Sequence, residues 1–74
     1  MVNGIEINPK IMLGKPVIKG TRIPVYLIVE LVAQGLTYEE ILQDYPHLTK
    51  RDIQNALEYA GNVIKNEEVF PLAK

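Results

Sequence analysis

The stretch that decides the fold runs from residue 14 to residue 25 and consists of Gly14-Lys15-Pro16-Val17-Ile18-Lys19-Gly20-Thr21-Arg22-Ile23-Pro24-Val25. Each proline fixes its own φ and disfavours the helical conformation in the residue before it, so the stretch cannot form one helix. The β-branched Val17 and Ile18 suit a short strand, and Gly20 suits the turn that follows because glycine adopts positive φ. Pro24 fits the first turn of a helix, where proline is best tolerated. We therefore expect extended structure before this stretch and helices after it.

The same stretch places glycines and lysines near a strand-to-helix junction, which raises the question of phosphate binding. In a P-loop the lysine directly follows the second glycine, whereas here Lys19 precedes Gly20. The prolines also remove backbone donors, so the spacing argues against nucleotide binding. Two interpretations remain open: a turn that fixes how strand meets helix, or a basic rim that contacts nucleic-acid phosphates. The rim would consist of Lys10, Lys15, Lys19 and Arg22.

Size and composition narrow the class of protein. The chain has 74 residues, a formal net charge of −1 and no cysteine. A domain of this size buries only about 60% of the surface of its unfolded chain, so we expect a homodimer to add stability. The lack of cysteine excludes disulfides and thiolate chemistry. The amino terminus lacks the pattern of a secretion signal, and no apolar run approaches the length of a membrane helix. We expect a cytoplasmic protein that does not bind membranes.

Charge is distributed unevenly along the chain. The first third carries Lys10, Lys15, Lys19 and Arg22 against Glu6, and the middle carries Glu30, Glu39, Glu40 and Asp44. A chain with this balance cannot bind nucleic acid by bulk attraction. Binding would need a local basic patch, repeated by the symmetry of a dimer.

The segments on either side of the central stretch differ in their hydrophobic pattern. Ile5 and Ile7 alternate with polar residues, as in a half-exposed strand, and with Val17 they would form a small β-ribbon. The sequence leaves open whether the ribbon pairs within one subunit or between two. A first helix is expected over 24–34, ending at Gly35. It is apolar around most of its circumference, so it should be buried on more than one side, either as a central core helix or shared between the core and a subunit interface.

Two further helices begin with the same capping signal. Thr37 is followed three residues later by Glu40, and Thr49 is followed by Asp52. In each pair the threonine hydroxyl and the carboxylate can satisfy amides at the start of a helix reciprocally. Each threonine cap should contribute about 1 kcal/mol to stability.

A short connection joins these two helices, which are expected over 37–45 and 49–65. It consists of Pro46, His47 and Leu48. Two helices joined by so tight a turn form a helix-turn-helix. The apolar residues of the third helix, 49–65, recur at helical spacing and define an inward face. This face consists of Ile53, Ala56, Leu57, Ala60 and Ile64.

The outward face of the third helix is the clearest functional signal in the chain. It carries Lys50, Arg51, Gln54, Asn55 and Glu58. In a helix-turn-helix this face enters the major groove of double-stranded DNA, where arginine suits guanine and glutamine or asparagine suits adenine. We therefore predict base contacts by Arg51, Gln54 and Asn55, and phosphate contacts by Thr49 and Lys50. The competing interpretation is an ordinary solvated helix face, and Glu58 would repel phosphate.

The remaining residues offer little chemistry. His47 is the only histidine and has no second ligand beside it in the sequence, so we expect neither a metal nor another cofactor. No nucleophile with an adjacent base is apparent, which predicts a protein that is not an enzyme. The tail carries Val69, Phe70 and Leu72. It either folds back over the core or docks in a groove of a partner protein.

Several strings of the sequence resemble the small bacterial and archaeal family known as Domain of Unknown Function 433. They include Gly20-Thr21-Arg22-Ile23-Pro24-Val25 and Asp44-Tyr45-Pro46-His47-Leu48-Thr49, and the likeness extends from Ile5 to about Ala60. Asn8-Pro9 departs from the expected Asp-Pro. The resemblance implies a homeodomain-like, often dimeric helix-turn-helix fold, similar to antitoxins of the VapB type that are encoded beside a PIN-like ribonuclease toxin. The family supplies no catalytic residues to carry over.

Residues and resemblance together predict a single mainly α domain over 1–74. It would comprise an extended arm with a β-ribbon (1–23), a three-helix homeodomain-like bundle (24–65) and a tail (66–74). The expected function is that of an antitoxin-like component of a type II toxin-antitoxin system. A homodimer would bind operator DNA through the third helix and hold a PIN-like toxin through another surface. The alternative is a protein-interaction adaptor whose helix-turn-helix is architecture only and binds no DNA.

Overall fold

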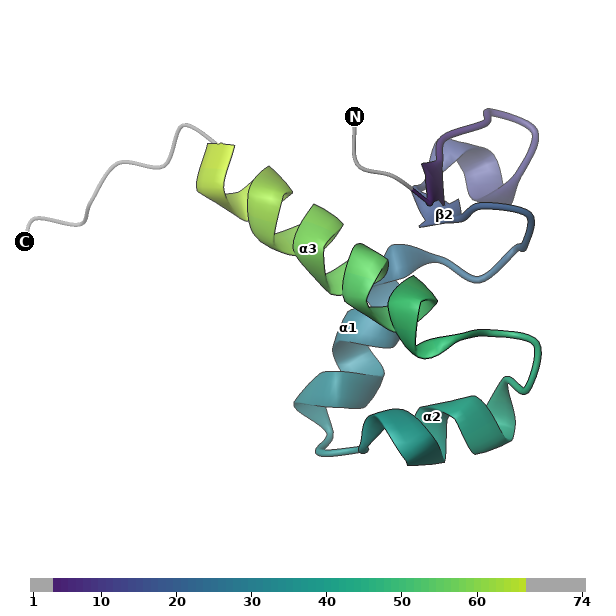
Figure 1. Cartoon of the computed structure of the whole chain (residues 1–74). Coiled ribbons are helices and arrows are strands. Elements are labelled where there is room, and N and C mark those ends of the chain that lie inside the picture. Colours follow the sequence, from purple (N-terminus) through teal and green to yellow (C-terminus); the bar gives the residue numbers. More distant parts are fainter. Residues whose placement is uncertain (1–3, 67–74) are drawn as a thin grey trace, which may run out of the picture.

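The protein folds as three helices preceded by a two-stranded antiparallel ribbon (Figure 1). The computed structural model describes residues 4–66. The elements in chain order are β1 (Ile5–Glu6), a 3₁₀ turn η1 (Met12–Gly14), β2 (Val17–Ile18), α1 (Val25–Ala33), α2 (Tyr38–Asp44) and α3 (Lys50–Asn66). The mainly α class and the order of the predicted elements are confirmed. None of the described helices has the length and apolar character needed to cross a bilayer.

The ribbon pairs within one chain. Ile5 lies opposite Ile18, and Glu6 lies opposite Val17. The amide of Lys19 extends the pairing by donating to the Gly4 carbonyl oxygen at 2.8 Å. The question that the sequence left open is thereby answered in favour of pairing inside the subunit.

Thr21 holds the turn that follows β2. Its hydroxyl donates to the carbonyl oxygen of Ile18 at 2.7 Å and accepts from the amide of Ile23 at 2.9 Å. Gly20 occupies the turn with a φ of +80°, a conformation that glycine adopts without a Cβ clash. Pro24 then immediately precedes α1 as its N-cap. The central stretch is therefore a strand, a turn and a helix entry, as its prolines predicted.

The end of α1 is fixed by a glycine. The Gly35 amide donates to the Val32 carbonyl oxygen at 2.9 Å, and the Leu36 amide donates to the Leu31 carbonyl oxygen at 3.2 Å. Gly35 has a φ of +94°. These two bonds and the left-handed glycine form a Schellman motif, which satisfies the last carbonyls of the helix.

Of the two interpretations of α1, a central core helix is wrong, whereas a helix shared between the core and a subunit interface stays a prediction. Only Val25 and Ile28 of this helix are buried, and they face the core. On the other side, Tyr26 is 48% exposed and Val29 is 36% exposed. The helix is therefore buried along one side and open along the other, although its sequence is apolar around most of its circumference.

Both predicted capping boxes are present. The amide of Glu40 donates to the Thr37 hydroxyl at 3.2 Å, and the Glu40 carboxylate accepts from the Thr37 amide at 2.8 Å. At the start of α3, the Asp52 amide donates to the Thr49 hydroxyl at 3.1 Å and the Asp52 carboxylate accepts from the Thr49 amide at 2.9 Å. The beginnings of α2 and α3 are thus set by residues adjacent in sequence.

The core lies mainly between α1 and α3, which cross in the middle of the molecule, with α2 on one side and the ribbon on the other (Figure 1). It consists of Ile5, Ile18, Val25, Ile28, Ile41, Leu48, Ile53 and Ala56. Ile64 was expected on the inward face of α3, but it is 67% exposed. The reason is that α3 is longer than the core it covers: every residue from Gly61 to Asn66 is exposed.

Candidate nucleic-acid interface

The outward face of α3 is open to solvent where the sequence predicted DNA contacts. Lys50, Arg51 and Gln54 are exposed, whereas Ile53 and Ala56 on the other side of the helix are completely buried. This division follows from the helical repeat, because residues three or four apart share a face. The side chains of Arg51 and Gln54 are therefore free to meet another molecule.

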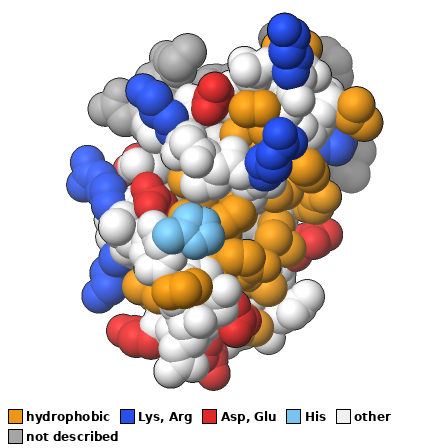
Figure 2. Space-filling model, turned by 90° about the vertical axis from the view of Figure 1, so that its right-hand side faces the viewer, with side chains coloured by type: hydrophobic (Ala, Val, Ile, Leu, Met, Phe, Trp, Pro, Cys, Tyr) orange, Lys and Arg blue, Asp and Glu red, His pale blue; other side chains and the backbone are white. Residues whose placement is uncertain are grey.

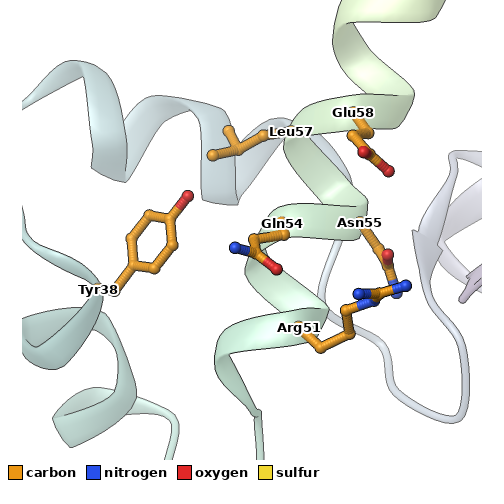
Figure 3. A pocket seen from close by; sticks show the side chains of 6 residues that line it. All are labelled: Tyr38, Arg51, Gln54, Asn55, Leu57 and Glu58. Carbon is orange, nitrogen blue, oxygen red and sulfur yellow. The ribbon is translucent and has the colours of Figure 1, made fainter.

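The structure adds a residue that sequence reasoning missed. A shallow hollow of about 450 Å³ is lined by Tyr38, Arg51, Gln54, Asn55, Leu57 and Glu58. Tyr38 is the first residue of α2 and lies across the hollow from Gln54 (Figure 3). The Thr37 capping signal predicted that Tyr38 begins a helix. It did not predict that the first turn of α2 faces α3.

The side chains around the hollow point in two directions. Gln54 and Leu57 extend towards the side of α3 where Tyr38 lies, whereas Arg51, Asn55 and Glu58 form a stripe on the other side (Figure 3). The structure therefore divides the predicted base-contacting residues between two edges of one helix face. The carboxylate of Glu58 lies at the same edge as the Arg51 guanidinium, about two helical turns further along α3.

Asn55 differs from its neighbours because the amino-terminal arm lies against it. The residue is partly buried, and a Cβ added to Gly4 would lie 2.5 Å from the Asn55 Nδ2 atom. Gly4 has a φ of +81°, so the arm reaches α3 in a conformation that favours glycine. The side chain of Asn55 thus has less freedom than those of Arg51 and Gln54.

The start of α3 carries both signs of charge. Thr49 and Lys50 are exposed, as phosphate contact requires. The carboxylate of Asp52, however, already accepts a hydrogen bond from the Thr49 amide. That carboxylate occupies part of the space in which a helix amino terminus would hold an anion. Lys50 and the hydroxyl hydrogen of Thr49 remain the groups best suited to a phosphate.

The residues of the predicted basic rim flank β2 in the chain. Lys10, Lys15, Lys19 and Arg22 are all exposed. Lys15 is set apart by its Nζ atom, which lies 5.9 Å from the centre of the Tyr26 ring, within the range of a cation–π contact. On the face shown in Figure 2, lysines and arginines stand apart from one another, with hydrophobic and acidic side chains between them. Phosphate contacts by Lys15, Lys19 and Arg22 stay a prediction.

Two other predictions concern metals and the tail. Within residues 4–66, no cluster of three or more histidine, cysteine, aspartate or glutamate side chains is arranged to bind a metal ion. Val69, Phe70 and Leu72 lie outside the described residues, so a partner contact through them stays a prediction.

Comparison with known proteins gives consistent matches. The uncharacterized protein y4eO of Sinorhizobium fredii is 42% identical over 53 residues, which cover 72% of this chain and 24% of the relative. The crystal structure of a DUF433 member protein from Anabaena variabilis superposes with a TM-score of 0.79 at 36% identity, covering 85% of this chain and 62% of that one. The chain thus spans about a quarter of the curated relative and about three-fifths of the solved one.

A family model places these likenesses in one group. The model described as "Protein of unknown function (DUF433)" matches residues 5–60. These residues include the ribbon, α1, α2 and most of α3. With this match over most of its length and a solved member that shares its fold, the chain belongs to the DUF433 family.

Proposed function

We propose that this protein is the antitoxin-like component of a type II toxin-antitoxin system. It binds operator DNA through α3 and neutralises a PIN-like ribonuclease. One observation carries the DNA-binding part: Lys50, Arg51 and Gln54 stand exposed together at the beginning of α3. This is the part of a helix-turn-helix that enters the major groove.

The side chains suit the two kinds of DNA contact. The planar guanidinium of Arg51 can donate two hydrogen bonds to O6 and N7 of guanine, and the amide of Gln54 can pair with adenine. Asn55 can contribute a further base contact at the edge that it shares with Arg51. Lys50 and the Thr49 hydroxyl would hold phosphates, which fixes the register of the helix on the duplex.

The proposed binding of a toxin rests on the family resemblance and on the apolar residues of the tail. The family resemblance suggests a PIN-like toxin as partner, and the apolar residues Val69, Phe70 and Leu72 are suited to docking in a groove. A homodimer would present two copies of α3 to a pseudo-palindromic operator. In this role the protein acts in the cytoplasm, without a cofactor and without catalysis of its own.

The DNA-binding part is tested by fluorescence anisotropy with labelled duplex from upstream of the protein's own reading frame. Arg51→Ala should weaken binding to the specific site by about 1–3 kcal/mol, because a bidentate base contact is lost. Lys65→Ala is the matched control, since it removes an exposed cation from the last turn of the same helix. Wild-type protein that shows no salt-sensitive binding to this DNA would refute the DNA-binding part.

The same DNA and variants, combined with co-purification, distinguish an antitoxin from a protein-interaction adaptor. Co-purification with the product of the neighbouring gene, combined with DNA binding that Arg51→Ala weakens, supports the antitoxin. Co-purification without any DNA affinity assigns the chain to the adaptor class, in which α2 and α3 are only architecture.

A further inference from the structure

A second surface lies between α1 and α3, away from Arg51 and Gln54. It is an apolar groove of about 440 Å³. One wall is formed by Tyr26 and Val29 of α1, and the other by Tyr59, Val63 and Ile64 of α3. The hollow at Arg51 is rich in polar side chains, whereas this groove is almost entirely hydrophobic.

Several large apolar side chains of the groove are exposed to solvent. Ile64 is 67% exposed, Tyr26 is 48% exposed and Val63 is 42% exposed. Single exposed apolar residues are ordinary on protein surfaces, but a contiguous group on two helices marks an interaction site. The exposed turns of α3, from Gly61 to Asn66, continue the groove beyond the core.

Two charged residues border the groove at different positions along α1. Lys15 lies over the ring of Tyr26, near the beginning of α1. Glu30 also lines the groove and is one helical turn further along α1 than Tyr26, about 6 Å at 1.5 Å per residue. The groove therefore carries a positive charge towards one end of α1 and a negative charge towards the other.

Such a surface is complementary to itself. In an interface with twofold symmetry, a residue i that meets residue j of the partner implies that j meets i. A twofold axis perpendicular to α1 reverses the helix in the second copy. Lys15 of one copy then faces Glu30 of the other, twice, while the hydrophobic walls cover each other.

We propose that this groove is the surface through which two copies of the chain associate. Tyr26, Val29, Val63 and Ile64 form its hydrophobic centre, and Lys15 with Glu30 sets the antiparallel arrangement. At about 100° per residue, Val63 lies about 180° around α3 from Gln54, and Ile64 lies about 140° around it from Arg51. Association through the groove goes beyond the proposed DNA contact and does not depend on it.

The first test is sedimentation equilibrium of the full chain over a range of protein concentrations. Wild type should associate to a dimer. Val63→Glu should weaken association at least a hundredfold, because it places an unpaired carboxylate in the hydrophobic centre. Asn62→Glu adds the same charge at the neighbouring exposed position outside the groove, and it should leave association nearly unchanged. Circular dichroism shows whether each variant retains its helices.

The second test addresses the antiparallel arrangement through charge reversal. Lys15→Glu alone and Glu30→Lys alone should each weaken the dimer about tenfold or more, because each makes two like-charge contacts. The double variant with both reversals should recover most of the wild-type affinity, because opposite charges meet again.

Several results would overturn the proposal. A full-length chain that remains monomeric at high micromolar concentration leaves the groove to its own tail or to a different protein. A dimer that Val63→Glu and Asn62→Glu weaken equally, or in which the double reversal gives no recovery, associates through another surface. Each result can be obtained without DNA, so failure here is distinct from failure of operator binding.

Discussion

Gly4 and Asn55 connect the amino-terminal arm to α3. Gly4 has a φ of +81°, and a Cβ there would lie 2.5 Å from the Asn55 Nδ2 atom, so the end of the Asn55 side chain would have to move. Gly20 shares the positive φ, at +80°, but a Cβ there would meet nothing within 4 Å. A comparison of alanine substitutions at these two glycines therefore separates the effect of backbone conformation from the effect of a close contact.

We predict that Gly4→Ala destabilises the protein more than Gly20→Ala. Gly20→Ala should lower the free energy of unfolding by about 1–2 kcal/mol, because alanine is strained at this φ. Gly4→Ala should show this loss and a further loss from displacement of the Asn55 side chain. Urea unfolding of both variants measures the difference. In an Asn55→Ala background the excess should vanish; an excess that persists means that the contact is not its cause.

The backbone conformations and long-range contacts of individual residues were the hardest features to predict from the sequence. Met12 and Leu13 adopt positive φ values of 51° and 57°, which no sequence pattern signals because such residues seldom take this conformation. The Gly4 contact joins residues far apart in the chain, so local spacing could not reveal that Asn55 is partly covered. The exposure of Arg51 and Gln54 on α3 followed from helical spacing, but the division of this helix face into two edges became visible only in three dimensions.

At the scale of elements, the boundaries of α2 and α3 were predictable because their signals are local. Thr37 and Glu40, like Thr49 and Asp52, need only each other and the backbone between them. Gly35 ends α1 in the same local manner. Such signals act over three or four residues, a range that a sequence displays directly.

We predict that Thr37→Ala and Thr49→Ala each lower the free energy of unfolding by about 1 kcal/mol, because each removes a helix cap. The two caps lie at different helices, so the losses should add in the double variant to within about 0.5 kcal/mol. Chemical denaturation measures all three. The serine variants are the controls, since they retain the hydroxyl; a Thr→Ser loss as large as the alanine loss would show that the hydroxyl is not responsible.

The burial of elements was less predictable than their limits. The hydrophobic pattern of α1 indicated burial on more than one side, yet the side that carries Tyr26 and Val29 is open. Ile64 continues the inward pattern of α3 but lies beyond the core. A pattern of apolar residues predicts which faces of a helix are hydrophobic. Only the three-dimensional structure shows whether other residues of the same chain pack against those faces.

At the scale of the whole molecule, stability depends on a small hydrophobic core. The side chains of Ile28, Ile41 and Ile53 have no exposed surface. Within the described part of the chain, no polar or charged side chain is buried with them. A domain of this size is expected to be stable by only about 0.05–0.15 kcal/mol per residue, so the loss of one core side chain matters greatly.

We predict that Ile28→Ala lowers the free energy of unfolding by about 2–5 kcal/mol, because it leaves a cavity between α1 and α3. Ile64→Ala removes the same atoms from a side chain that is 67% exposed, and it should change the stability of the isolated chain by about 0.5 kcal/mol or less. Thermal and urea unfolding at low protein concentration provide the comparison. Equal losses in the two variants would contradict the core described above.

The exposed turns at the end of α3 have a consequence for the behaviour of the chain in dilute solution. Every residue from Gly61 to Asn66 is exposed, and the end of a helix that lies outside the core opens at little cost in free energy. Its hydrogen bonds should therefore open more often in the isolated chain than when another surface covers them. The number of slowly exchanging backbone amides in residues 61–66 should therefore report whether another molecule covers this segment. It should be higher in the bound chain than in the isolated one.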